Sequence, residues 1–219
     1  MTTLREPLLA ALGVEHGFAL AGQALPGLAR ARQVHAAGVV RAEDCIDADP
    51  LLEADALVSV TRGVGACVVT ADCVPVLLAV ADGSAVAAIH AGWRGLAAGV
   101  IEAGVEALVR AAGVSVRELS AGVGPHAGAC CYEVDTPVLD ALARRHARAL
   151  ERAARPVRPG HALLDLSALA RSALLAAGLD PVSVGQAAFA CTCCDPRRYP
   201  SYRRDGPRAG RLLHFVSPA

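Results

Sequence analysis

Four short apolar segments between residues 55 and 90 constrain the fold more than any other part of the sequence. They read DALVSV, ACVVT, VPVLLAV and SAVAAIH, with Gly and Asp between them, which is the pattern of short strands. Apolar residues then recur at helical spacing over 96–112, and further helices are expected from Thr136 onward and over roughly 164–177. Strands grouped ahead of helices predict an α+β fold with mixed sheets. Residues 180–219 are expected to be irregular.

The size and charge of the chain exclude several classes of protein. Its 219 residues suffice for one sizeable core, so residues 1–219 are expected to form a single domain. The 21 basic and 21 acidic residues balance, which argues against nucleic acid or a membrane surface as partner. The longest apolar run, residues 73–81, is far shorter than the ~20 residues that span a bilayer.

The N-terminal sequence has charges at Arg5 and Glu6 and lacks a signal-peptide pattern. We therefore expect a cytoplasmic protein, a monomer or small homo-oligomer, whose eight cysteines are reduced thiols rather than disulfides. Reduced thiols are available for metal binding or catalysis.

A predicted hairpin places a cysteine near a histidine. If Ala81 pairs with Ser84 across a turn, His90 pairs with Pro75, and Cys73 is a diagonal neighbour of His90 on the same face. Diagonal neighbours lie ~7–8 Å apart. A three-residue turn would shift the register and move one of the two to the opposite face.

A thiol and an imidazole this close support three interpretations. Cys73 and His90 could be zinc ligands together with a further histidine, which leaves a fourth position open, as in catalytic zinc sites. Cys73 could instead be a nucleophile with His90 as its base. The third interpretation is a buried structural cysteine beside a histidine that is hydrogen-bonded in the core.

The segment Gly92-Trp93-Arg94-Gly95 lies between a predicted strand and a predicted helix. Free backbone N–H groups, a helix N-terminus and Arg94 meet there, which favours an anion such as phosphate. An ordinary turn is the alternative interpretation of residues 92–95.

Arg203 and Arg204 form a basic pair near the end of the sequence. The pair is either a solvated charge pair or a further anion-binding element.

Several segments together resemble a known family. They are ALVSVTRGVGACVVTADCVPVLLAV, IHAGWRGLAAGVIEAGV, GPHAGACCYEV and SYRRDGPRAGR, and the likeness extends from RQVH at 32–35 to residues 210–211. The sequence is similar to the family once labelled multicopper polyphenol oxidase or laccase-domain proteins and now described as zinc-dependent purine nucleoside phosphorylases. The resemblance implies a sandwich-like core of mixed sheets flanked by helices.

The resemblance also implies a site and a chemistry. A single Zn²⁺ would be held by His35, Cys73 and His90. The implied reactions are phosphorolysis of adenosine, inosine, guanosine and methylthioadenosine to the free base and ribose-1-phosphate, together with deamination of adenosine. Purine nucleosides and inorganic phosphate would be the partners.

Within that scheme other residues receive hypothetical roles. The residues expected to hold phosphate are Arg94, Arg203 and Arg204. Asp72, beside Cys73, could orient a ligand or protonate the departing base. Copper could load in place of zinc, because its intrinsic affinity for such ligands is higher.

Some residues depart from the family pattern. His126 stands where members commonly carry Cys, so it is either an extra polar group at the site or a neutral surface change. Cys191, Cys193 and Cys194 form a cluster that we interpret as reduced thiols, since the sequence alone does not locate a fourth metal ligand.

Rival functions remain at this stage. A cysteine or zinc hydrolase that edits peptidoglycan precursors through Cys73 and His90 is one, because some bacterial members of the family are so described. A non-catalytic module with a structural zinc is another. A multicopper oxidase is disfavoured, because the seven histidines include no His-x-His pair. A cytidine-type zinc deaminase is disfavoured by the absence of its sequence signature.

Overall fold

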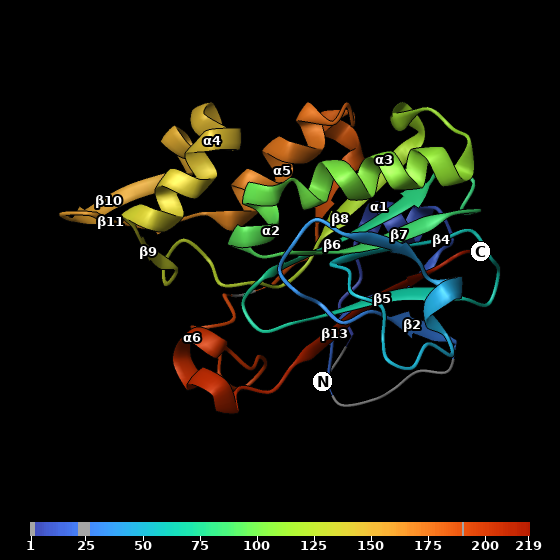
Figure 1. The fold of residues 1–219 in the computed structure, drawn as a ribbon, viewed down its shortest axis with the longest axis horizontal. Coiled ribbons are helices and arrows are strands. Elements are labelled where there is room, and N and C mark those ends of the chain that lie inside the picture. Colours follow the sequence, from blue (N-terminus) through green and yellow to red (C-terminus); the bar gives the residue numbers. More distant parts are fainter. Residues whose placement is uncertain (1–2, 22–26, 190) are drawn as a thin grey trace.

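The computed structural model describes residues 3–21, 27–189 and 191–219. In these residues two β-sheets pack face to face, helices cover the outer face of one sheet, and a small third sheet lies at one end (Figure 1). This is the α+β architecture of mixed sheets with flanking helices that the sequence predicts.

The larger sheet lies between the helices and the second sheet. Its strand order is β12 (Val184–Gln186), β8 (Leu119–Val123), β6 (Val74–Val80), β7 (Val86–Ala91), β4 (Ala56–Ser59) and β3 (Val39–Arg41).

Strands β6 and β7 form the predicted hairpin. The loop takes residues 81–84, closed by hydrogen bonds between the backbones of Val80 and Ala85 (2.9 Å) and of Gly83 and Val80 (2.8 Å). Pro75 pairs with His90, so the predicted register is confirmed. His90 therefore shares a strand face with residues that pack toward the second sheet.

The second sheet has the order β1 (Glu15–Ala21), β13 (Leu212–Ser217), β5 (Gly65–Thr70) and β2 (Leu28–Arg30). The expectation that residues 180–219 are irregular is wrong for β13, which pairs with both β1 and β5. The strand is a short apolar run, LLHFV. It follows a stretch rich in Cys, Arg and Gly, whose composition is typical of irregular structure and dominates the prediction for the whole segment.

Each face of β6 and β7 contributes to a different core. Val76, Leu78 and Ile89 pack among the buried residues beneath the helices. Leu77 and Ala88 lie on the opposite face, in the core between the two sheets. All five side chains are completely buried, which explains why these strands are apolar throughout rather than alternating.

The helices mostly follow the predicted boundaries. One predicted helix over 96–112 is instead two, α2 (Trp93–Ala98) and α3 (Val100–Ala112), because Gly99 adopts φ 90° and ends α2. α4 (Thr136–Ala153) begins at the predicted residue. α5 (Leu166–Ala176) begins two residues later than expected, where the Asp165 side chain accepts a hydrogen bond from the Ala168 N–H.

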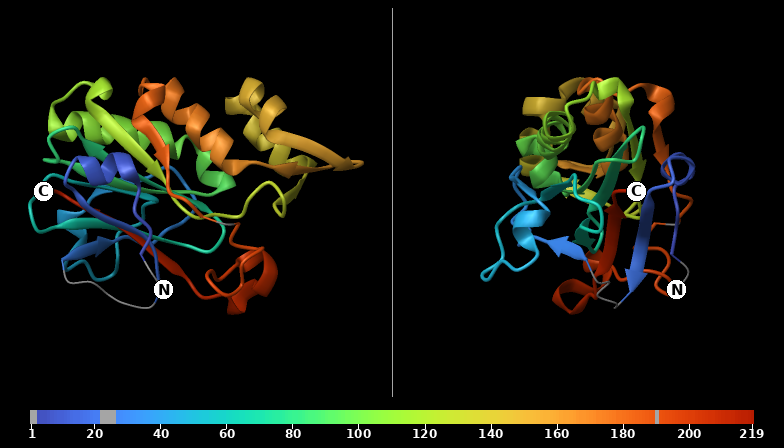
Figure 2. Two further views of the ribbon diagram at one scale, coloured as in Figure 1. Left: turned by 180° about the vertical axis from the view of Figure 1, so that it is seen from behind. Right: turned by 90° about the vertical axis from the view of Figure 1, so that its right-hand side faces the viewer.

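The remaining elements lie around this body. The third sheet has the order β10 (Ala154–Arg158), β11 (His161–Leu164) and β9 (Glu133–Asp135), and the β10–β11 ribbon projects from the molecule (Figure 2). The short helices α1 (Pro7–Ala11) and α6 (Tyr202–Asp205) complete the fold. Across the described residues, no helix combines the length and the apolar character needed to cross a bilayer.

Candidate metal centre

Three side chains able to bind a metal converge where β7 ends and α2 begins. His35 follows β2, Cys73 directly precedes β6, and His90 is the penultimate residue of β7. One potential ligand atom of each lies within 4.8 Å of those of the other two. The two imidazole rings meet edge to face, with centroids 4.8 Å apart. The structure thus brings together the three residues that the sequence analysis named as zinc ligands.

A buried carboxylate that the sequence analysis missed orients both histidines. Asp55 Oδ1 lies 2.8 Å from His90 Nδ1, which leaves Nε2 of that ring as the atom available for a metal. The same carboxylate accepts hydrogen bonds from the backbone N–H groups of Val34 (3.1 Å), His35 (2.9 Å) and Ala36 (2.8 Å). Asp55 therefore fixes the His90 ring and the loop that carries His35 at once.

The backbone around the three ligands is tightly packed. His35 has φ 59°, a left-handed conformation that side chains rarely adopt, and the hydrogen bonds to Asp55 hold it there. A Cβ atom at Gly92 would lie 2.9 Å from Cys73 Sγ and 3.5 Å from His35 Cδ2. Glycine is therefore required at position 92 for the ligands to approach one another.

The charge states of Cys73 and His90 depend on each other. Burial raises the pKa of the Cys73 thiol, but the neighbouring His35 and His90 imidazoles outweigh it and bring that pKa to about 7. Burial lowers the pKa of His90, whereas its contacts with Asp55 and Cys73 raise it to about 9. In the metal-free protein the interaction of Cys73 with the two imidazoles therefore makes its thiolate far more accessible near neutral pH than that of an ordinary cysteine.

The pKa of Asp55 lies below its usual value. Burial alone would raise it, but the hydrogen bonds from His90 and from the backbone of residues 34–36 stabilise the ionised form. The group facing His90 is thus a carboxylate, which increases the basicity of a metal-binding imidazole.

A cavity of about 430 Å³ opens beside the three ligands. Two arginines line it, each stacked on an aromatic ring: Arg94 Cζ lies 4.3 Å from the Trp93 ring centroid and Arg203 Cζ 4.9 Å from that of Tyr132. The other lining residues include His35, Asp72, Cys73, Leu166 and Tyr202.

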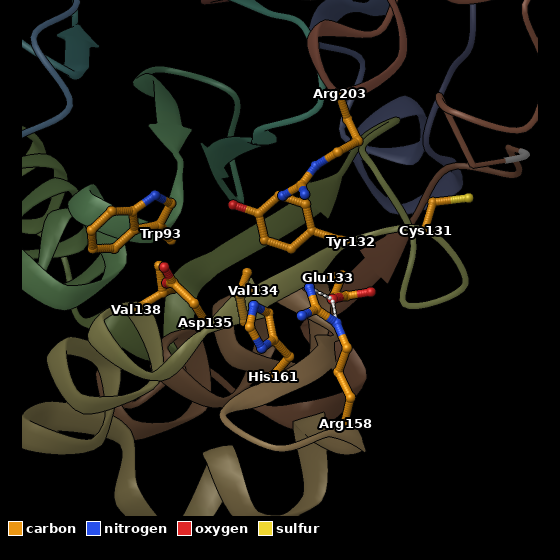
Figure 3. A pocket seen from close by; sticks show the side chains of 10 residues that line it. All are labelled: Trp93, Cys131, Tyr132, Glu133, Val134, Asp135, Val138, Arg158, His161 and Arg203. Atoms are coloured by element: carbon orange, nitrogen blue, oxygen red, sulfur yellow. Dashed lines mark hydrogen bonds and ion pairs between the residues drawn. The ribbon is translucent and has the colours of Figure 1, made fainter.

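A second cavity of about 560 Å³ adjoins the first, since both are lined by Trp93, Tyr132 and Arg203 (Figure 3). Its far side carries the ion pair of Arg158 with Glu133, whose Nη2 and Oε1 lie 2.6 Å apart. The two hollows together provide room for a ligand larger than a phosphate ion.

Asp72, a predicted site residue, lines the first cavity, but both of its carboxylate oxygens already accept hydrogen bonds from other residues of the protein. Its oxygens accept hydrogen bonds from Thr192 Oγ1 (2.6 Å), Ser201 Oγ (2.9 Å) and the Arg203 N–H (2.6 Å). These contacts tie the segment that carries Arg203 to the base of the cavity. The arrangement favours positioning over proton transfer.

Arg204 is not brought into either cavity. Its guanidinium donates to the carbonyls of Thr192 (2.9 Å), Cys193 (3.1 Å) and Tyr199 (2.9 Å) and to the carboxylate of Asp205 (2.8 and 2.7 Å). The nitrogens that a phosphate would need already have partners within the protein. The two arginines of the predicted pair therefore have different surroundings.

His126 lies apart from the three ligands. It is buried, its Nδ1 is 2.8 Å from the Gly124 carbonyl oxygen, and its ring meets that of Phe189 edge to face. Burial lowers its pKa, so the ring is neutral near pH 7. His126 is thus a packed core histidine, rather than a surface residue.

The donor set fits a borderline-soft divalent metal. A thiolate and two imidazoles bind zinc or copper in preference to magnesium or calcium, which prefer oxygen ligands. Three protein ligands, two of which (His35 and Cys73) line the cavity, leave a coordination position open, which distinguishes catalytic from structural zinc sites. His35 is exposed whereas His90 is 3% exposed, so the group is reached from the cavity side.

The fold and these ligands define an α+β protein with a candidate mononuclear metal centre at the end of its central hairpin. The chain belongs to the family described as multi-copper polyphenol oxidoreductase laccase, whose family model matches residues 15–218. Within the described residues, the groups of three or more potential ligands are this one and a group of four cysteines. Neither contains the several paired imidazoles of a multicopper oxidase.

Curated relatives carry other names. A purine nucleoside phosphorylase of Xylella fastidiosa is 43% identical over 184 residues, covering 83% of this chain and 68% of the relative. One of Pseudomonas aeruginosa is 42% identical over 184 residues, covering 84% and 71%. An adenosine deaminase, RL5, from an unknown prokaryotic organism is 34% identical over 199 residues, covering 88% and 75%.

Solved structures share the fold. The hypothetical protein YfiH of Bacillus licheniformis matches with a TM-score of 0.81 and 28% identity, covering 90% of this chain and 76% of that one. The protein NMB0706 of Neisseria meningitidis matches with a TM-score of 0.79 and 36% identity, covering 87% and 74%.

Proposed function

We propose that this chain is a zinc-dependent purine nucleoside phosphorylase. It would convert adenosine, inosine, guanosine or methylthioadenosine and inorganic phosphate into the free base and ribose-1-phosphate, with deamination of adenosine as a second activity. The names of its relatives support this class. The observation that carries the proposal is that His35, Cys73, Arg94 and Arg203 line one cavity, which sets metal ligands beside cations suited to phosphate.

The chain's own residues would divide the work as follows. Arg94 and Arg203 would bind phosphate oxygens, with Trp93 and Tyr132 holding the guanidinium planes in place. Asp72 would position Arg203 through the hydrogen bond from its backbone N–H. The cavity would exclude water around the sugar.

A zinc ion bound by His35, Cys73 and His90 would supply a Lewis acid to this cavity. Asp55 would keep the His90 ring oriented and its Nδ1 hydrogen-bonded. Copper is an alternative occupant, because it outranks zinc in intrinsic affinity for thiolate and imidazole ligands.

The test is a product analysis on protein of known metal content. The chain is incubated with adenosine and with inosine, with and without phosphate, and the products are separated by chromatography. Free base with ribose-1-phosphate, formed only with phosphate, is the expected result. Absence of purine release and of inosine from adenosine, with zinc at full occupancy in the three-ligand centre, would contradict the proposal.

A second candidate is a cysteine or zinc hydrolase acting on peptidoglycan precursors. The favourable observation is the pKa of about 7 for Cys73 beside a His90 pKa of about 9, a pairing that also suits a nucleophilic thiolate. If the cysteine form is correct, metal-free protein would be active and alkylation of Cys73 would abolish that activity; a zinc form would lose activity when the metal is removed. Phosphate-dependent turnover with zinc bound favours the phosphorylase instead.

A cytoplasmic location and a monomeric or small homo-oligomeric state remain predictions. Cell fractionation and light scattering on the purified chain are the measurements that check them.

A further inference from the structure

Four cysteines from two distant segments converge outside the centre described above. Cys130 and Cys131 precede β9, whereas Cys191 and Cys194 lie in the loop after β12. Their four Sγ atoms all lie within 4.8 Å of one another. The sequence alone locates no fourth metal ligand for Cys191, Cys193 and Cys194, and therefore predicts reduced thiols there. The fold supplies the missing partners from residues 130 and 131.

The sulfur positions suit a tetrahedral thiolate site. Zinc–sulfur bonds of ~2.3 Å place the sulfurs of such a site about 3.8 Å apart. The Sγ atom of Cys194 lies 3.2 Å from that of Cys131 and 3.6 Å from that of Cys130. All four cysteines are free, and these separations far exceed the ~2 Å of a disulfide bond.

The backbone holds each pair in a tight turn. The Cys131 N–H donates to the Gly128 carbonyl (3.0 Å), and the Cys194 N–H donates to the Cys191 carbonyl (3.0 Å), so 191–194 is a compact Cys-x-x-Cys turn. The Gly128 N–H also donates to Cys191 Sγ at 3.2 Å. An N–H group directed at a sulfur stabilises the thiolate that a metal requires. Cys130 and Cys194 are exposed, so an ion can enter from solvent.

The neighbouring cysteine provides an internal contrast. Cys193, within the same turn, has its Sγ 3.1 Å from Ser201 Oγ and 3.9 Å from Asp72 Oδ1. It does not belong to the four-sulfur group. The turn therefore separates two cluster cysteines from a third thiol that faces another part of the protein.

We propose that Cys130, Cys131, Cys191 and Cys194 form a second metal site, a closed four-thiolate zinc site with a structural role. Four protein ligands leave no open position, in contrast to the three-ligand centre. As the ion binds, the thiols release their protons to the buffer.

The site would connect two walls of the cavities. Cys131 adjoins Tyr132, and its sulfur points away from that ring, out of the hollow (Figure 3). The Cys191–Cys194 turn contains Thr192, which donates to Asp72 Oδ1 at 2.6 Å. A metal here would fix the segment leading to Arg203 against the segment that carries Tyr132. This proposal does not depend on the reaction that the cavity performs.

The test counts zinc per chain after reconstitution and removal of loosely bound metal. Wild type is expected to hold two ions, and a Cys130→Ser/Cys194→Ser double variant one. A His35→Ala/His90→Ala variant is expected to hold one as well. Cys193→Ser is the matched control and should retain both. Reaction with a thiol reagent should be slow at the four cysteines until a chelator is added.

A spectroscopic measurement complements the metal counts, and in wild type it does not depend on whether any variant folds. Cobalt(II) added to the apoprotein should fill both sites, and sulfur-to-cobalt charge-transfer absorption of a four-thiolate site should persist in the His35→Ala/His90→Ala variant. A single zinc in wild type, with all four thiols immediately reactive, would overturn the proposal. So would a mass decrease of about 2 Da per pair of thiols, which marks disulfides instead.

Discussion

Asp55 shows how much of a metal centre is set by a residue that touches no metal. Its carboxylate contacts the His90 ring and accepts hydrogen bonds from the backbone N–H groups of residues 34–36, so a single buried charge fixes that ring and the loop that carries His35. Such partners of metal-binding histidines contribute to affinity by fixing the ring orientation and raising ligand basicity.

We predict that Asp55→Asn weakens zinc binding at the three-ligand centre by about 10–100-fold. The amide keeps one oxygen but loses the charge that faces His90, and some of the backbone N–H groups lose their acceptor. Competition with a chromogenic chelator measures the affinity. Asp82→Asn, in the exposed hairpin loop, is the control. Equal affinities in the two variants would refute the positioning role.

Arg203 and Arg204 are adjacent in sequence but have different surroundings, so alanine variants of the two serve as controls for each other. Arg203→Ala should raise the KM for phosphate at least about tenfold, because a cavity-facing guanidinium is removed, with little change in unfolding temperature. Arg204→Ala should instead lower the unfolding temperature, because three carbonyl groups lose their donor. Steady-state kinetics and thermal unfolding are measured on both. Identical behaviour of the two variants would contradict these assignments.

At the residue scale, the sequence indicated the three candidate ligands but not the carboxylate that holds them. The proximity of Cys73 to His90 followed from hairpin register alone. His35 lies in an isolated loop, so only the family resemblance suggested it. Asp55 was overlooked because DALVSV predicts only a strand, and nothing in the local sequence relates its first residue to His90. One signal for Asp55 was available: a single carboxylate lies directly before a segment that is buried on both faces. A buried carboxylate needs a charged or hydrogen-bonding partner, which points to a functional site.

Among the elements, α3 lies unusually close to β7. A Cβ at Gly104 would be 2.5 Å from Ile89 Cδ1 and 3.0 Å from its Cγ1. Ile89 directly precedes His90, so the packing of this helix supports the strand that carries a candidate ligand.

We predict that Gly104→Ala destabilises the protein by about 1–2 kcal/mol, because the cost of overpacking exceeds the roughly 1 kcal/mol gained in helix propensity. Ala111→Gly, at an exposed position of the same helix, measures the propensity effect alone and should cost about 1 kcal/mol. Urea unfolding of both variants gives the two values. A stabilising Gly104→Ala would show that α3 can move away from β7 without cost.

The element boundaries reveal what local patterns can and cannot indicate. The β6–β7 hairpin and the start of α4 were predictable, because turn residues and a first-turn proline mark them. The break at Gly99 was not, because glycine is compatible with a helix and only the packing shows its φ of 90°. β13 was missed because its strand partners are distant in sequence.

At the scale of the whole molecule, the fold buries some histidines, His214 among them, in neutral form. His214 in β13 is fully buried, its Nε2 is 2.9 Å from Thr70 Oγ1, and burial lowers its pKa to about 3. The unfolded chain binds a proton at this residue near pH 6.5, whereas the folded chain does so only near pH 3. Stability is therefore lost as the pH falls through this interval.

We predict that His214 alone removes about 2 kcal/mol of stability between pH 7 and pH 5. Urea unfolding of metal-free wild type and His214→Gln at both pH values measures the effect. The variant should be less stable at pH 7 but should lose about 2 kcal/mol less on acidification. Parallel losses in both proteins would mean that His214 is protonated in the folded state.

The α+β class was predictable because strand segments cluster ahead of the helical ones, and the structure confirms it; the sandwich-like core with flanking helices was implied by the family resemblance alone. The pairing of the sheets was not predictable, since it joins segments far apart in the chain. The four-cysteine group was not predictable either, because its members at 130–131 and at 191 and 194 are far apart in the sequence and come together only in the folded chain.

The position of β13 between β1 and β5 has a consequence for synthesis on the ribosome. In the described structure β1 pairs within its sheet with β13 alone, although residues 15–21 are made long before residues 212–217. Until translation reaches β13, β1 and β5 each lack the partner strand that satisfies this edge. The nascent chain should therefore depend on chaperones most strongly just before its final strand emerges.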